Sequence, residues 1–329
     1  MKIAMGLLLL VSIGLLSTVA LSLIFGGPSQ PPAMTDINGP FKALDNRDLP
    51  ELDTYQARDG SQLAYRHYPA EASGDAGNGS VVLLHGSAGN SRSLHTLARA
   101  YADAGFSAYS LDVRGHGASG PRGDIAYIGQ LEDDLQDFID AVGPATPRTL
   151  VGFSSGGGFA LRVAGSQHPQ RFAHYLLLAP FISQEAPTYR PDSGGWTSVG
   201  LPRYITIALL NQLGIDTFNH LPVMRYAVDD EVAPSLTPAY SFTLAQNYRP
   251  RPDYLATLEA VDRPMRVLAG RDDQIFRAEH FAPVFQHAGH EVPVKLLPGI
   301  EHIGLILDPG AIDAAIAETR HLIDTNPAR

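Results

Sequence analysis

The sequence predicts an α/β protein built on a mostly parallel, doubly wound sheet. Short apolar and β-branched runs alternate with segments of helical periodicity from about residue 51 onward, with one long interruption. Strands that alternate with helices pair in parallel, and the helices then cover both faces of the sheet. Several of the apolar runs are followed by glycine, histidine, aspartate or serine. Such folds bind ligands at the carboxyl ends of their strands, so a site is expected at that edge.

The composition is that of an acidic globular protein. The chain of 329 residues is 44% hydrophobic and 18% charged, enough for one large domain with an insertion or for two small domains. Its net charge of -10 and the lack of a basic cluster argue against a nucleic-acid partner. The absence of cysteine excludes disulfides, thiolate metal sites, a cysteine nucleophile and a lipid-modified cysteine.

The N-terminal 27 residues predict a signal anchor. An uncharged apolar run occupies residues 3–25, and a membrane-spanning helix needs about 20 such residues. The run has no polar face, which argues against a soluble core helix. The positively charged Lys2 directly precedes this run, and positive charges favour the cytoplasmic side of a membrane. We therefore expect a cytoplasmic N-terminus and a catalytic body in the periplasm or outside the cell. The alternative is a cleaved signal peptide, with a weak cleavage site at Thr18-Val19-Ala20 and a secreted body.

Residues 28–50 predict a linker. They begin with a proline- and glycine-rich stretch and then remain polar, so no regular structure is expected before the body begins at residue 51. The expected elements of the first half of the body are strands at 54–57, 63–68, 81–84 and 106–111 and helices at 93–104 and 128–142. The first two strands are joined through Asp59-Gly60, a hairpin signal.

The second half of the body continues the alternation after a long interruption. The expected elements are strands at 149–151, 175–178, 265–269 and 292–297 and a closing helix at 311–323. Between residues 181 and 258 the alternation stops, over a stretch too long for a simple connection. This stretch predicts a helical cap inserted into the sheet domain. We expect some of the apolar side chains at residues 204–213 to line a pocket beneath it.

The most informative motif is Gly152-Phe153-Ser154-Ser155-Gly156. It follows one apolar run and leads into a helical one, which is the strand–turn–helix setting of a nucleophile elbow. The turn strains the serine backbone and leaves no room for a Cβ two positions before or after it. Ser154 is therefore the candidate nucleophile. Ser155 is not, because a motif centred on it needs glycine where Phe153 stands.

Three further loops follow predicted strands. His85-Gly86-Ser87 comes after the strand at 81–84, and its turn can direct the Ser87 N–H toward the elbow, where the Ser155 N–H is the second candidate oxyanion donor. Asp272 and Asp273 follow the strand at 265–269. His302 follows the last strand. The chain order serine, aspartate, histidine is the order used by this kind of fold.

On these motifs the body resembles the α/β-hydrolase superfamily over nearly all of residues 51–329. Residues 112–123, with the sequence DVRGHGASGPRG, resemble the monoacylglycerol lipase, lysophospholipase and serine aminopeptidase branch. In that branch this stretch is structural, so no catalytic role is assigned to His116. The resemblance implies Ser154 as nucleophile, Asp273 rather than Asp272 as the acid, and His302 as the base.

The resemblance also implies the oxyanion N–H groups of Ser87 and Ser155 and a reaction without metal or organic cofactor. A carboxylic ester hydrolase for monoacylglycerol- or lysophospholipid-like substrates is the leading expectation. A serine aminopeptidase is an alternative, with Asp229, Asp230 and Glu231 as an acidic subsite for the substrate amine. An acyltransferase would use the same three residues, and a non-catalytic binding module would require one of them to be missing.

Overall fold

The computed structural model describes residues 2–42, 44–71, 78–166, 171–231 and 233–326. Within these residues, eight strands form the central sheet, in the order β1-β2-β4-β3-β5-β6-β10-β11. The strands are β1 (Asp53–Gln56), β2 (Gln62–Tyr68), β3 (Ser80–Leu84), β4 (Ser107–Leu111), β5 (Arg148–Phe153), β6 (His174–Leu178), β10 (Met265–Gly270) and β11 (Val294–Leu297). The hairpin β1–β2 and the pair β2–β4 are antiparallel, and the other pairs are parallel. The expected α/β class with a mostly parallel sheet is confirmed.

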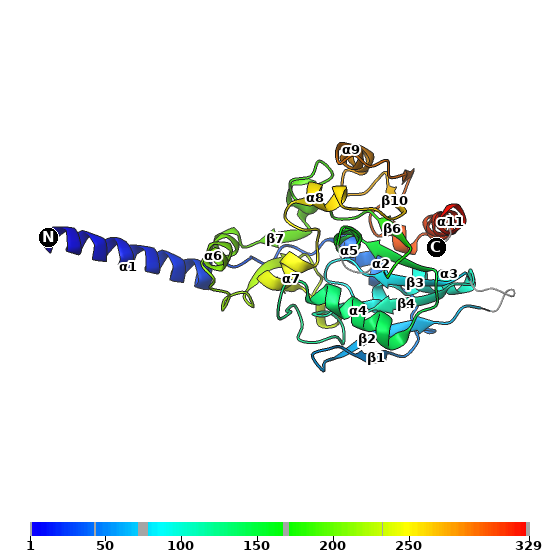
Figure 1. Ribbon diagram of the computed structural model, residues 1–329, viewed down its shortest axis with the longest axis horizontal. Coiled ribbons are helices and arrows are strands. Elements are labelled where there is room, and N and C mark those ends of the chain that lie inside the picture. Colours follow the sequence, from blue (N-terminus) through cyan, green and yellow to red (C-terminus); the bar gives the residue numbers. More distant parts are fainter. Residues whose placement is uncertain (1, 43, 72–77, 167–170, 232, 327–329) are drawn as a thin grey trace.

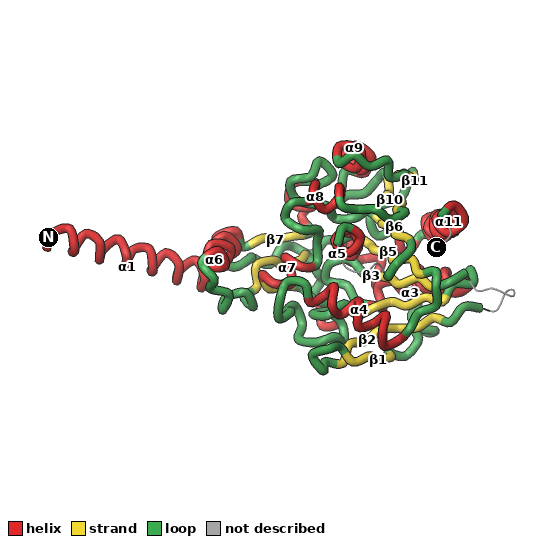
Figure 2. The backbone as a smooth tube through the Cα atoms, viewed as in Figure 1, coloured by secondary structure: helices red, strands yellow, loops and turns green. Residues whose placement is uncertain are grey.

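Helices cover both faces of this sheet (Figures 1 and 2). They are α3 (His95–Asp103), α4 (Gln130–Val142), α5 (Ser155–Ala164), α8 (Tyr254–Glu259), α9 (Phe281–His287), α10 (Gly304–Leu307) and α11 (Pro309–Thr325). Helices α3 and α11 are linked by the Tyr101 hydroxyl, which contacts the Thr319 hydroxyl at 2.8 Å. Helices α4 and α5 are linked by the Glu132–Arg162 ion pair at 2.5 Å. These contacts connect the two helices of each pair.

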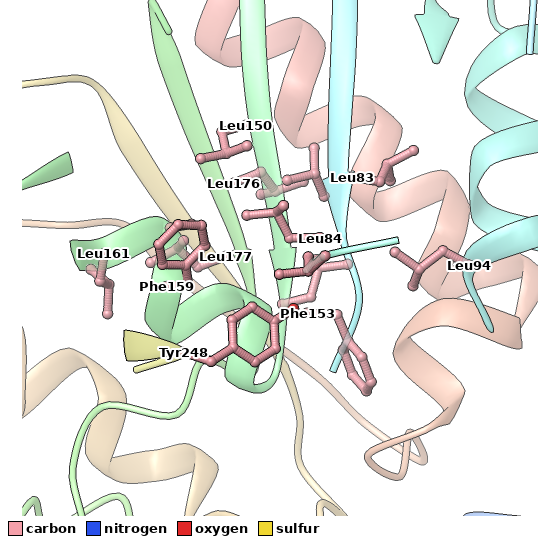
Figure 3. Close-up of a cluster of buried hydrophobic side chains, with 14 of the residues drawn as sticks. Leu83, Leu84, Leu94, Leu150, Phe153, Phe159, Leu161, Leu176, Leu177 and Tyr248 are labelled. Carbon is pink, nitrogen blue, oxygen red and sulfur yellow. The ribbon is translucent and has the colours of Figure 1, made fainter. Parts of the chain in front are cut away.

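The core lies along the central strands. All five residues of β3 and all five of β6 are buried, as expected for strands covered on both faces. Figure 3 shows leucines of β3, β5 and β6 packed against Phe159 and Leu161 of α5 and against Tyr248. This core fixes the register in which Leu84 pairs with Gly152 and Phe153 pairs with Leu178. The loops that follow these strands are thereby held at one edge of the sheet.

The segment expected to be a helical cap is mixed in structure. It contains β7 (Thr197–Val199), α6 (Leu201–Gln212), β8 (Pro222–Tyr226), β9 (Ala239–Ser241) and α7 (Phe242–Asn247). The strands form an antiparallel sheet in the order β7-β8-β9. The segment contains the helices α6 and α7 that a helical cap would have, and in addition three strands that were not expected. These strands have three to five residues, so their alternation is too short to be read from the sequence.

Helix α1 (Lys2–Phe25) contains the apolar run at residues 3–25. It projects from the body, and α6 lies beside its C-terminal end (Figure 1). The expectation of an irregular chain up to Pro50 is wrong for α2 (Thr35–Lys42), a helix that follows the proline-rich stretch. It is held by the body: the Asn38 amide donates to the carbonyl oxygens of Met34 and Ala227, at 2.6 and 2.8 Å. So short a helix depends on such tertiary contacts.

Candidate active site

Ser154 lies at a strained turn between β5 and α5. Its φ of 54° and ψ of -117° lie outside the regions that L-residues readily adopt. Two flanking glycines make this turn sterically feasible. A Cβ on Gly152 would lie 2.4 Å from the Gly156 carbonyl oxygen, and a Cβ on Gly156 would lie 2.4 Å from the Leu84 carbonyl oxygen. The sequence motif therefore has the steric basis that was expected of it.

The imidazole of His302 is held by a buried carboxylate. Asp273 Oδ2 lies 2.7 Å from His302 Nδ1, and both side chains are almost fully buried. The other carboxylate oxygen accepts the backbone N–H groups of Ile275 and Phe276, both at 2.8 Å. With Oδ1 occupied by the backbone, only Oδ2 faces the ring, and Nδ1 must carry a hydrogen to bond it. The second nitrogen, Nε2, is then left free to accept a proton.

The two loops that carry these residues are joined by backbone contacts. Gly270, at the end of β10, is so close to the histidine loop that a Cβ on it would lie 2.0 Å from the Ile300 carbonyl oxygen. The Asp272 N–H donates to the same oxygen at 3.1 Å, and the Gln274 side chain accepts the His302 N–H at 3.1 Å. The relative position of acid and imidazole is thus built into the backbone.

The structure separates the two neighbouring aspartates. Asp273 is 1% exposed and contacts His302, whereas Asp272 is an exposed residue. Only its backbone N–H contacts the histidine loop. The preference for Asp273 over Asp272 is therefore consistent with the geometry of the loop.

The two candidate oxyanion donors lie in segments adjacent to Ser154. Ser155 is the first residue of α5, and Ser87 follows β3 through Gly86. A Cβ on Gly86 would lie 3.2 Å from the Cβ of Ser154, so the β3 loop approaches the serine closely. The Ser87 hydroxyl accepts a hydrogen bond of 2.8 Å from the indole N–H of Trp196, which lies just before β7 of the cap. This hydrogen bond links the cap to the loop that follows β3.

His116 does not contact Ser154, Asp273 or His302 among the hydrogen bonds of the described residues. It is fully buried, and its Nε2 contacts the Tyr240 hydroxyl at 2.5 Å while its Nδ1 contacts the Val113 carbonyl oxygen at 3.1 Å. Its ring packs edge-on against that of His85. Burial holds the pKa of His116 well below its usual value and lowers the pKa of His85 to about 4. Both rings are neutral at pH 7 and act as core residues.

Two cavities meet at the serine. One has a volume of about 340 Å³, and a second of about 160 Å³ lies under the cap. Ser87, Ser154, Trp196 and Ile275 line both, whereas His302 lines the larger one. The smaller cavity is walled mainly by aromatic and aliphatic side chains of the cap, including Tyr204, Met224, Tyr226, Tyr240 and Tyr248. A substrate with two arms could therefore extend in both directions from Ser154.

Helix α2 forms part of the larger cavity and was missed in the sequence analysis. Ile37 and Phe41, four residues apart and thus on one helical face, line the cavity. Lys42 at the end of the helix pairs with Asp229 at 2.9 Å and with Glu231 at 2.8 Å. The i, i+4 spacing of the two apolar residues was the available signal. The proline at position 40 and the polar flanks concealed it.

The acyl-pocket expectation for residues 204–213 is only partly met. Tyr204 lines the smaller cavity, and Ile207 is fully buried. Ile205, Leu209 and Leu213 instead point outward, with exposed fractions of 53%, 55% and 75%. Both sides of α6 are apolar, so helical periodicity did not reveal which side faces the pocket.

Comparison with known proteins identifies the family. A family model described as serine aminopeptidase, S33 matches residues 75–309. Monoacylglycerol lipase of Mycolicibacterium smegmatis is 28% identical over 239 residues, which cover 68% of this chain and 81% of that protein. Among solved structures, a soluble variant of monoglyceride lipase from Saccharomyces cerevisiae, in complex with a substrate analog, is similar with a TM-score of 0.66 and 19% identity. The similar region covers 87% of this chain and 99% of the lipase chain.

A membrane phospholipase A, described as a bacterial virulence factor, is similar over 100% of this chain and 99% of its own, with a TM-score of 0.54 and 16% identity. At these identities the structural likenesses bear on the fold. Together with the family match, the comparisons show that the chain belongs to the serine aminopeptidase S33 family, in the monoacylglycerol lipase-like branch of the α/β-hydrolases, and is a carboxylic ester hydrolase.

Proposed function

We propose that the protein hydrolyses lipid-like esters, of the monoacylglycerol or lysophospholipid type, through an acyl-enzyme on Ser154. One observation carries this proposal. Ser154, at a strained turn, lines the same cavity as His302, whose Nδ1 is bonded to the buried carboxylate of Asp273. A nucleophile, a base and a group that orients the base are the three parts that acyl transfer by a serine requires.

The reaction proceeds in two stages. His302 Nε2 takes the Ser154 hydroxyl proton as Oγ attacks the ester carbonyl. The N–H groups of Ser87 and Ser155 stabilise the oxyanion, and His302 then protonates the leaving alcohol as its C–O bond breaks. In the second stage His302 takes a proton from a water molecule as that water attacks the acyl-enzyme. The imidazolium then returns the proton to Ser154 Oγ as the bond between Oγ and the acyl carbon breaks, and the acid is released. Asp273 keeps the imidazole in its tautomer and stabilises the imidazolium formed in both stages.

The cavities support a lipid-like substrate. The smaller one offers an apolar wall for an acyl chain, and each methylene buried there contributes about 0.8 kcal/mol. The larger one contains polar side chains, such as Asn38, Asn90 and Arg92, that suit an alcohol or head group. Lipase names among the relatives agree with this assignment.

The aminopeptidase alternative is favoured by one residue and opposed by its surroundings. Glu231 lines the larger cavity and could meet a substrate amine. However, Glu231 and Asp229 both pair with Lys42, whose ammonium already occupies the position of such an amine. Hydrogen bonding from Lys42 also holds the pKa of Asp229 below its usual value. We therefore place esters ahead of aminoacyl amides. An acyltransferase would share the first stage and replace water with a second alcohol.

We also propose that α1 anchors the protein in a membrane, with the body exported. The 23 residues Ile3–Phe25 form a segment long and apolar enough to span a membrane. Along most of this segment the side chains do not contact the rest of the protein. Lys2 favours a cytoplasmic N-terminus. A cleaved signal peptide is the alternative. Sequencing the N-terminus of the mature protein distinguishes them, because cleavage would start the chain near Leu21.

The substrate proposal is tested with a panel of glycerol and 4-nitrophenyl esters of graded acyl length, beside aminoacyl amides. Octanoyl esters are expected to be cleaved with a higher kcat/KM than acetyl esters, and the amides with a much lower one. Faster turnover of acetyl esters, or efficient release of N-terminal residues, contradicts the substrate class.

A further inference from the structure

Arg249 brings a positive charge to the wall of the smaller cavity. It follows α7 through Tyr248, whose ring packs against Phe159 of α5 (Figure 3). Ser154 and Ser155 line the same cavity. Among the described residues that line it, Arg249 is the one with a charged side chain. An arm of the ester that enters this cavity from Ser154 therefore meets a cation.

The guanidinium of Arg249 has no anionic partner. Within the described part of the chain it makes no hydrogen bond and no ion pair, and its Nε atom is buried. Its carbon lies 6.0 Å from the centroid of the Phe181 ring, which offers a cation–π contact but no acceptor. The two fully buried arginines, Arg114 and Arg162, by contrast each pair with a carboxylate, at 2.7 and 2.5 Å.

Burial of this charge is unfavourable without a counter-ion. Desolvation lowers the pKa of Arg249, and the charges of Tyr204 and Glu185 offset this effect only in part. Glu185 is exposed and, among the ion pairs of the described residues, forms none with Arg249. An arginine stays protonated at neutral pH even so. A bound anion would supply the partner that the protein itself does not.

The segment that carries Arg249 is held beside the strained turn. A Cβ on Gly158 in α5 would lie 3.0 Å from Cδ of Pro250, so the chain after Arg249 packs against the beginning of this helix. Phe181, under the guanidinium, donates its backbone N–H to the Ser154 carbonyl oxygen at 3.0 Å. The position of the charge relative to the nucleophile is therefore fixed by backbone contacts.

Two further features of the smaller cavity favour an anion. Helix α5 begins at Ser155, which lines the cavity, and the N-terminal end of a helix carries partial positive charge. Tyr189 lines the cavity as well, with its ring edge-on to that of Phe181 and the centroids 6.2 Å apart. Its phenol O–H is a donor of the kind that a carboxylate or phosphate accepts.

We propose that Arg249 forms an anion subsite in the smaller cavity, which binds a carboxylate or phosphate group on the arm of the ester that enters this cavity. This inference rests on the proposed ester hydrolysis and narrows its substrate class to esters with one anionic arm. A guanidinium binds either anion through two parallel N–H donors. The anion is carried by the far end of an acyl chain or by a glycerophosphate alcohol.

The kinetic test compares esters that differ in one anionic group. The first set consists of 4-nitrophenyl half-esters of glutaric, adipic and suberic acid, each beside the 4-nitrophenyl ester of the linear monocarboxylic acid with the same number of carbons. The second set is 1-octanoylglycerol 3-phosphate beside 1-octanoylglycerol. We expect a higher wild-type kcat/KM for the anionic ester in one of the two sets. Preference in the first set places the acyl chain in the smaller cavity, and preference in the second places it in the larger one.

Three variants assign this preference to the guanidinium. Arg249→Gln is expected to lower the ratio of anionic to neutral kcat/KM at least tenfold, because a charge-assisted hydrogen bond is lost. Arg249→Lys keeps the charge and is expected to retain a higher ratio than Arg249→Gln. Arg251→Gln is the matched control: Arg251 is exposed and does not line the cavity, so its ratio should stay within twofold of the wild-type ratio.

A wild-type preference for the neutral ester in both sets overturns the inference. That comparison needs no variant, so it does not depend on the folding of Arg249→Gln. A ratio that Arg249→Gln leaves unchanged also overturns the inference. The same holds for a ratio that Arg251→Gln lowers equally, because the overall charge of the protein would then cause the preference.

Binding without turnover separates this inference from the proposed hydrolysis. Trp196 is the one tryptophan of the chain and lines both cavities, so its fluorescence reports their occupancy. The Ser154→Ala protein is titrated with monomethyl adipate beside methyl hexanoate, and with 1-octanoylglycerol 3-phosphate beside 1-octanoylglycerol. In one of the two pairs we expect an at least tenfold lower Kd for the anionic ligand, and loss of this difference when Arg249→Gln is added.

The two proposals then fail in different ways. Binding of the anion that depends on Arg249, without hydrolysis of any ester by the wild-type protein, supports the subsite and contradicts the hydrolase. Hydrolysis of anionic and neutral esters without a preference that depends on Arg249, together with equal Kd values in both pairs, supports the hydrolase and overturns the subsite.

Discussion

Replacing Asp273 with asparagine changes one atom of the side chain and tests the geometry of the site. The carboxylate has two separate partners: Oδ1 accepts the N–H groups of Ile275 and Phe276, and Oδ2 faces His302 Nδ1 at 2.7 Å. Asparagine has only one oxygen. If that oxygen stays with the two backbone donors, the amide NH2 group points at the ring.

An NH2 group facing Nδ1 reverses the histidine tautomer. Nδ1 must then accept a hydrogen bond, so the ring proton moves to Nε2, which can no longer take the Ser154 proton. The loss in kcat is expected to approach 10⁴-fold, equivalent to about 5 kcal/mol of transition-state stabilisation. The volume is conserved and the backbone contacts survive, so the protein should remain folded.

Asp272→Asn is the matched control. Asp272 is exposed, and its contact with Ile300 uses the backbone N–H, which asparagine retains. This variant is expected to keep at least half of the wild-type kcat. Both variants are assayed on 4-nitrophenyl butyrate, with melting curves that match the wild type as the criterion of folding. A larger loss in Asp272→Asn, or small losses in both, refutes the assignment of Asp273.

Gly270→Ala places a Cβ against the Ile300 carbonyl oxygen and shifts the histidine loop, so kcat should fall about 100-fold; wild-type kcat in this variant contradicts the close approach. Met224→Trp fills the smaller cavity, so the ratio of octanoyl to acetyl ester kcat/KM should fall at least tenfold, and an unchanged ratio removes the acyl chain from that cavity. The pKa of His85, about 4 in the folded protein, lies below the usual 6.5, so acid favours the unfolded chain, which binds the proton. The free energy of unfolding should therefore fall by about 3 kcal/mol between pH 6.5 and pH 4. Chemical denaturation at each pH measures this change, and a free energy of unfolding that does not vary with pH contradicts the prediction.

The elements that the sequence could predict are those whose pattern has a single physical explanation. The strand at 81–84 is apolar at every position, and the buried β3 follows from it. Gly152 and Gly156 are required beside Ser154 because a Cβ on either would lie 2.4 Å from a backbone carbonyl oxygen. The glycines of the motif therefore predicted the turn. The loops that carry Asp273 and His302 could be placed because both follow recognisable strands of a parallel sheet.

The parts that were missed depend on contacts distant in sequence. Helix α2 is a helix because Asn38 bonds to Ala227 and Lys42 pairs with residues of the cap, and no local pattern contains that information. The cap strands are too short for their alternation to be visible. Helix α6 is apolar on both sides, so only the structure distinguishes Ile207, which is buried, from Leu209, which faces outward.

Covalent labelling is the most direct test of Ser154 as the nucleophile of an ester hydrolase. The purified protein is treated with a fluorophosphonate, digested and analysed by mass spectrometry to locate the adduct. We expect a single adduct on Ser154, no labelling of Ser154→Ala, and labelling of Ser155→Ala, which retains the backbone N–H of that position. An adduct on any other residue, or labelling that persists in Ser154→Ala, would show that Ser154 is not the nucleophile.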